Sequence, residues 1–142
     1  MVLADQAAGV LNAGVLSKKL PKVISPKVHA IIDYASIGAF VLMGALFWKR
    51  NKRASIAAFS CAAAEATTTL LTDFPGGVTD VISFETHGRI DAALAGAAAS
   101  LPNLLGFAGA PEAKHFRIQG LVIGAVTGMT TPEQQESEYD AA

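Results

Sequence analysis

Apolar residues fill four long stretches of this chain, and polar residues gather in the segments between them. The stretches cover residues 28–48, 54–72, 87–108 and 117–130. Most of their length carries no Asp, Glu, Lys or Arg, as in residues 34–48, 54–64 and 92–111. A helix of a soluble protein needs a polar outer face, and these stretches offer almost none. The pattern therefore predicts an all-α protein, an integral membrane four-helix bundle.

Breaking residues mark the ends of these predicted helices. Residues 28–48 give about 31 Å of helix at 1.5 Å per residue, which matches the hydrocarbon thickness of a bilayer. The sequence Asp-Phe-Pro-Gly-Gly at residues 73–77 ends the second helix. Pro102 lies inside the third helix and predicts a kink there. The fourth stretch is short, so we expect it to be tilted or partly interfacial.

The same pattern divides the chain into five segments. In residues 1–20 the apolar and polar positions fall on opposite sides of a helix, which fits a helix in the membrane interface, although a frayed arm is the alternative. The predicted segments are an N-terminal interfacial helix and basic linker (1–27), a first transmembrane hairpin (28–73), an acidic loop (74–86), a second transmembrane hairpin (87–130) and a disordered acidic tail (131–142).

One spacing of polar residues occurs twice. A His, an Asp four residues later and a Gly five residues after that Asp appear as His29-Asp33-Gly38 and again as His87-Asp91-Gly96. The two copies are 58 positions apart at all three places. A His and an Asp four apart share one face of a helix. We therefore interpret the second hairpin as a diverged copy of the first.

In a bundle of this topology these polar groups meet at one end. The first and third helices run in the same direction, and the second helix returns to the face where they begin. The predicted cluster consists of five residues: His29, Asp33, Asp73, His87 and Asp91. Glu65 lies two turns before the end of the second helix, and an acid at that depth should face the bundle interior.

The cluster has several possible roles. It can be a hydrogen-bonded lock between the hairpins, or a metal site in which two imidazoles and the carboxylates hold Zn²⁺ or Fe. It can also bind haem b through both His residues, with Lys27 and Arg89 near the propionates, or relay protons or ions through Glu65. Arg89 can instead pair with Asp33, Asp73 or Asp91, which would favour the lock.

Composition narrows the function classes. Only 16% of residues are charged, and the net charge of −1 argues against nucleic acid as a partner. Cys61 is the only cysteine, so there is no disulfide within the chain. No nucleophile motif, phosphate-binding loop or Cys-x-x-Cys pair occurs, so we predict no catalytic residue and favour a non-enzyme. The expected partners are the lipid bilayer and, in addition, a larger membrane complex or further copies of this chain.

Basic residues near the helix ends give a weakly biased topology. One end has six, Lys49, Arg50, Lys52, Arg53, Lys114 and Arg117, and the other has five, Lys18, Lys19, Lys22, Lys27 and Arg89. The positive-inside rule places the first set in the cytoplasm. The His/Asp end is therefore predicted to face outward.

Part of the sequence resembles a known family. Three segments carry the likeness, namely Leu-Leu-Thr-Asp-Phe at 70–74, the His-to-Gly spacing at 87–96 and Pro-x-Leu-Leu-Gly-Phe at 102–107. Over residues 28–130 the chain is similar to the SPW-repeat proteins, small bacterial membrane proteins with paired helical hairpins. It differs in having Leu101-Pro102-Asn103 for Ser-Pro-Trp and Gly44 for the Pro of the first copy. The resemblance implies this fold and the bacterial inner membrane, and it implies no activity.

Overall fold

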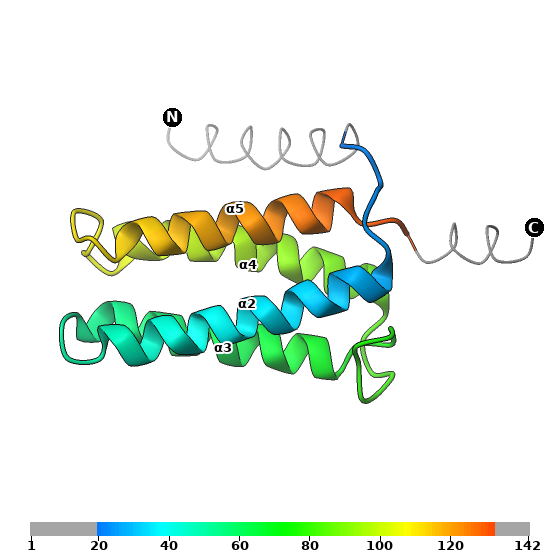
Figure 1. Cartoon of the computed structure of the whole chain (residues 1–142), viewed down its shortest axis with the longest axis horizontal. Helices are drawn as coiled ribbons and strands as arrows, with labels where there is room; N and C mark the ends of the chain where they lie inside the picture. The colour runs from blue at the N-terminus through cyan, green and yellow to red at the C-terminus, as the bar shows by residue number, and fades with distance from the viewer. Residues whose placement is uncertain (1–19, 133–142) are drawn as a thin grey trace, which may run out of the picture.

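Four α-helices make up the part of the chain that the computed structural model describes, residues 20–132. They are α2 (Pro26–Phe47), α3 (Lys52–Leu70), α4 (Phe84–Leu104) and α5 (Ala113–Met129). The helices run antiparallel in chain order as an elongated bundle (Figure 1). The all-α, four-helix prediction is confirmed for these residues. The predicted interfacial helix within 1–20 and almost all of the predicted tail lie outside the described residues.

Polar caps set where the helices begin. Ser25 precedes α2, its hydroxyl accepts a hydrogen bond from the Val28 backbone N–H, and Pro26 occupies the first turn. Ser83 caps α4 in the same way through the Thr86 backbone N–H. Such caps satisfy amide groups that have no partner inside the helix. These two helices therefore start two and three residues earlier than hydrophobicity alone predicts.

In each hairpin, a glycine lies where the two helices contact each other. α2 packs mainly on α3, and α4 packs mainly on α5. A Cβ on Gly44 would lie 2.8 Å from the Phe59 ring, and a Cβ on Gly120 would lie 2.7 Å from the Ala95 carbonyl oxygen. Ser55 also donates a hydrogen bond to the Gly44 carbonyl across the first hairpin. Small residues thus allow the backbones to approach closely.

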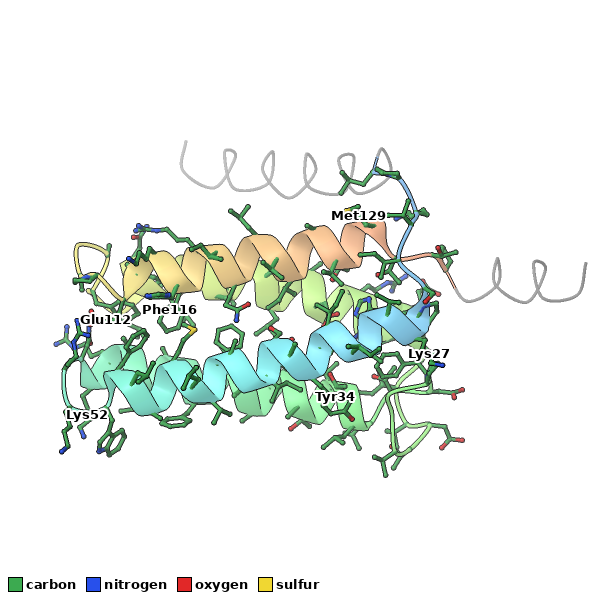
Figure 2. The ribbon with its side chains drawn as sticks, viewed as in Figure 1. Lys27, Tyr34, Lys52, Glu112, Phe116 and Met129 are labelled. Carbon is green, nitrogen blue, oxygen red and sulfur yellow. The ribbon has the colours of Figure 1, made fainter. Side chains whose placement is uncertain are left out.

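Aromatic rings fill the space between the two hairpins. Phe40 of α2 and Phe116 of α5 are fully buried, with ring centroids 6.4 Å apart. Phe107, from the α4–α5 loop, packs edge-on against Phe116 at 5.3 Å. Phe116 lies toward the end that carries the α2–α3 turn and the α4–α5 loop, at the left in Figure 2. This leaves the opposite end to polar residues.

The sequence repeat is visible in the backbone at that opposite end. The segment before α2 forms a β-bridge with the end of the second hairpin, between Ile24 and Thr130. The segment before α4 forms the corresponding bridge with the end of the first hairpin, between Ile82 and Thr72. Both members of the second bridge are 58 positions from their counterparts in the first. The end of each hairpin thus pairs with the segment that leads into the other hairpin.

The outer surface of the bundle is rich in large apolar side chains. Exposed examples occur on all four helices: Ile31, Val41, Leu42, Leu46, Ile56, Phe59, Leu104, Ile118, Leu121 and Val122. By length and composition, however, only α2 among the described helices is long and apolar enough to cross a membrane. One such helix is weak support for the membrane prediction, because the core helix of a soluble protein meets the same test.

Candidate metal centre

The structure brings four of the predicted residues together at one end of the bundle. His29 and Asp33 come from successive turns of α2, and His87 and Asp91 come from the matching turns of α4. One ligand atom from each residue lies within 4.8 Å of every other. We call these four residues the His/Asp cluster. All four are at most 4% exposed, so the bundle encloses four ionisable groups in its interior.

Both imidazole Nε2 atoms lie close to both carboxylates. His29 Nε2 lies 3.3 Å from Asp33 Oδ1 and 3.0 Å from Asp91 Oδ2. His87 Nε2 lies 3.2 Å from Asp33 Oδ2 and 3.0 Å from Asp91 Oδ2. Each carboxylate is therefore shared between the two hairpins. The Asp91 Oδ2 atom is equally close to both rings.

Threonine hydroxyls hold the other nitrogen of each ring. Thr130 Oγ1 lies 2.7 Å from His29 Nδ1, and Thr72 Oγ1 lies 2.9 Å from His87 Nδ1. Each of these hydroxyls donates its own hydrogen to a backbone carbonyl four residues earlier, at 2.6 Å. The hydroxyl oxygen must then accept from Nδ1–H, which fixes the proton on Nδ1 and leaves Nε2 facing the carboxylates.

His87 Nε2 is a buried polar atom without a hydrogen bond. The ring is fully buried, and neither nearby carboxylate oxygen lies in the direction that an N–H···O bond requires. A native structure rarely leaves such an atom unpaired, so each case calls for an explanation. An ion between the two rings and the two carboxylates would supply the missing partner.

Two phenyl rings cover the cluster. Phe74, from the α3–α4 loop, and Phe84, at the start of α4, stack on each other with centroids 5.4 Å apart. Phe74 lies 5.0 Å from the His87 ring, and Phe84 lies 5.5 Å from the His29 ring. The rings exclude water from one side of the cluster, where electrostatic interactions become stronger as a result.

Glu65 lies deeper in the bundle than the cluster and joins it through a small cavity. Its side chain is 2% exposed and accepts a hydrogen bond of 3.1 Å from Ser36. A cavity of about 10 Å³ is lined by Glu65 and Ser36 together with both aspartates and Thr127. This volume is close to the minimum for one water molecule. The prediction that Glu65 faces the bundle interior is confirmed.

A larger pocket reaches the cluster from the outside. Its volume is about 580 Å³, and its lining includes His29, Thr130 and Thr127 together with Gly88 and Glu85. Thr127 lines both this pocket and the small inner cavity. The histidine of the first hairpin is therefore approached from one side of the bundle, where Phe84 also lines the pocket.

Two sequence-based expectations do not fit the structure. Asp73 follows the end of α3, but its side chain is exposed and lies outside the His/Asp cluster. The neighbouring Thr72 points inward in its place, because the chain turns just after α3. Arg89 pairs with Glu85 at 2.6 Å on the exposed side of α4, so none of the aspartates is its salt-bridge partner.

The residues that sequence reasoning missed are the two threonines and the two phenyl rings. Thr72 and Thr130 are separated by the same 58 positions as His29 and His87. That shared offset was available in the sequence and would have linked the threonines to the site. No comparable signal marks Phe74 and Phe84, since their counterparts at this offset are Pro132 and Pro26.

Replacing Thr72 with valine should weaken the Zn²⁺ binding expected of a metal site in the His/Asp cluster about 10- to 100-fold, because it removes the acceptor that orients the His87 ring. Isothermal titration with Zn²⁺ measures this. Thr68→Val is the matched control, since Thr68 makes the same hydroxyl-to-carbonyl bond one turn earlier. Thr72→Ser keeps the hydroxyl and should restore binding. Equal affinity in Thr72→Val and wild type would contradict the role assigned to Thr72.

Comparison of this chain with models of protein families, with curated proteins and with solved structures gives no match. The resemblance to the SPW-repeat proteins therefore stays a prediction. What is known of the site rests on the residues of this chain alone.

Proposed function

We propose that this protein is a small membrane-embedded four-helix protein that binds one divalent transition-metal ion, Zn²⁺ or Fe²⁺, in the His/Asp cluster. The single observation that carries the proposal is the orientation of the imidazoles. Each Nδ1 is engaged by a threonine, and each Nε2 faces two carboxylates. Metal-binding histidines are held by this kind of hydrogen bond from the nitrogen that does not bind the metal.

The spacing of the cluster supports this ligand set. Four ligands at about 2.0–2.2 Å around a tetrahedral ion are separated from each other by roughly 3.3–3.6 Å. The N···O separations are 3.0 to 3.3 Å, and one ligand atom from each of the four residues lies within 4.8 Å of every other. Haem b fits poorly, because the His29 and His87 ring centroids are only 5.2 Å apart and leave no room for a macrocycle between them.

The membrane part of the proposal rests on the outer surface of the bundle. Large apolar side chains are exposed on each described helix, and monomeric soluble proteins rarely expose contiguous apolar patches of large area. The six basic residues at the end away from the cluster favour placing that end in the cytoplasm and the cluster toward the outside. A bacterial inner membrane follows from the resemblance to SPW-repeat proteins.

A second candidate function is a lock between the hairpins, within a subunit of a larger membrane complex or of an oligomer of this chain. His29 Nε2 makes a hydrogen bond of good geometry to Asp91, as a protonated imidazole would. Two such imidazoles and two carboxylates form a neutral buried set without any metal. If the cluster is such a lock, the bundle should have the same stability with and without metal.

Elemental analysis and a chelator separate the two candidates. We expect the protein, purified gently in detergent, to contain about one Zn or Fe per chain. Removal of the metal by a chelator should lower the melting temperature, and added metal should restore it, because a ligand that binds the folded state stabilises it. Metal content near zero, with a melting temperature that neither chelator nor added Zn²⁺ or Fe²⁺ changes, would leave the lock as the function of the cluster.

A further inference from the structure

The end of the bundle away from the cluster is strongly basic. It comprises the α2–α3 turn and the α4–α5 loop, and Figure 2 shows Lys52 and Glu112 together at this end, far from Lys27 and Met129. Its exposed basic side chains are Lys49, Arg50, Lys52, Arg53, Lys114 and Arg117. Within residues 45–55 and 102–118, Glu112 is the single acid. Most of the positive charge at this end therefore has no acidic residue beside it in the sequence.

The one acid at this end is already engaged inside the protein. Glu112 is 4% exposed, and its carboxylate lies 3.6 Å from Arg50 and accepts a hydrogen bond from Asn51. These contacts join the two hairpin tips. The carboxylate is thus turned away from the outer surface and does little to reduce the field of the remaining lysines and arginines.

A shallow, open pocket of about 570 Å³ lies between the two tips. Arg50, Lys52 and Arg53 line one side of it, and small or backbone-rich positions of the α4–α5 loop line the other, namely Gly106, Gly109 and Ala110. Gly106 has a φ of +72°, and a Cβ there would lie 3.2 Å from the Arg53 guanidinium. Arg53 also donates a hydrogen bond to the Leu105 carbonyl. Glycine at position 106 thus leaves space for the Arg53 guanidinium at the side of the pocket.

Exposed apolar side chains adjoin the residues that line this pocket. Trp48 comes just before the basic α2–α3 turn, and Leu104 and Leu105 come just before Gly106. The Lys52 ammonium sits 3.3 Å from the centre of the Trp48 ring, so the aromatic and basic groups are adjacent. A basic pocket with Trp and leucine beside it matches a phospholipid. The anionic phosphate would pair with the basic residues, and the acyl chains would contact the apolar ones.

We propose that the pocket between the hairpin tips binds the phosphate of an anionic phospholipid head group. This inference rests on the membrane placement proposed above and is independent of the metal. Guanidinium and ammonium groups from Arg50, Lys52 and Arg53 pair with the phosphate, and the exposed leucines contact the acyl chains. Bound lipid then holds the two tips together at the cytoplasmic face.

Lipid retention tests the proposal. The full chain is reconstituted in nanodiscs of phosphatidylcholine with phosphatidylglycerol, released into mild detergent, and the retained lipids are counted by native mass spectrometry. Wild type should retain phosphatidylglycerol in preference to phosphatidylcholine. Lys52→Gln/Arg53→Gln should reduce this preference at least about tenfold, given roughly 1 kcal/mol per basic residue. The charge-matched control Lys27→Gln/Arg89→Gln, exposed at the other end, should retain it.

A second variant distinguishes the loss of lipid binding from misfolding of the protein. A Cβ on Gly109 meets nothing within 4 Å, so Gly109→Asp should fold and place a carboxylate at the pocket wall, again reducing retention. No preference in wild type, or equal loss in the control pair, would overturn the lipid site alone. Displacement of phosphatidylglycerol by inorganic phosphate would assign the pocket to free phosphate instead. Failure of wild type to enter nanodiscs would instead contradict the membrane placement.

Discussion

Replacing Asp91 with asparagine should lower metal affinity at least about 100-fold. The Asp91 Oδ2 atom lies 3.0 Å from the Nε2 atoms of both histidines, so in the proposed metal site it is the oxygen shared by both rings. The amide has nearly the same shape but no charge, so the change removes a ligand without creating a cavity. Isothermal titration with Zn²⁺, together with metal content after purification, measures the effect.

Asp73→Asn is the matched control for this prediction. Asp73 lies at the same end of the bundle but is exposed and outside the His/Asp cluster, so its replacement should leave affinity unchanged. Equal loss in both variants would mean that general negative charge, and not the cluster, attracts the metal. Unchanged affinity in Asp91→Asn would remove Asp91 from the ligand set.

Replacing Gly77 with alanine should destabilise the protein by about 1–3 kcal/mol or more, the range expected for overpacking. A Cβ on Gly77 would lie 1.7 Å from the Thr72 carbonyl oxygen, a backbone atom that cannot rotate away. The α3–α4 loop must then move, and Thr72, which holds His87, moves with it. We therefore expect a lower melting temperature together with weaker metal binding.

Gly109→Ala provides the comparison for the loop at the other end. Its Cβ would meet nothing within 4 Å, so stability and metal affinity should both stay at wild-type values. Thermal unfolding monitored by circular dichroism, with and without Zn²⁺, measures both variants. A Gly77→Ala protein that melts and binds metal like wild type would mean that the loop can shift without disturbing Thr72.

Much of the architecture could be predicted from the sequence. The four apolar stretches predicted four helices, and the 58-residue offset of His29 and His87 predicted which helix starts lie together. These features are local, because they depend on hydrophobic pattern and on a spacing of one helical turn. Helix boundaries were less accurate, since capping by Ser25 and Ser83 extends α2 and α4 beyond their apolar stretches.

The turn after α3 decides which side chain, Thr72 or Asp73, contacts the His/Asp cluster. Asp73 and Thr72 are neighbours in the sequence, and both were plausible at the end of the second helix. The β-bridge between Thr72 and Ile82 turns the threonine toward His87 and leaves Asp73 exposed. One residue of register separates an inward side chain from an outward one, and no helical pattern reaches into this loop to predict it.

The sequence by itself determined the helices, the repeat and the pairing of His with Asp on one helical face, because each follows from short-range periodicity. The tertiary structure alone decided that each hairpin supplies the threonine that orients the other hairpin's histidine. Those two contacts join residues 101 and 15 positions apart. Their geometry depends on how two hairpins dock, which hydrophobic pattern does not encode.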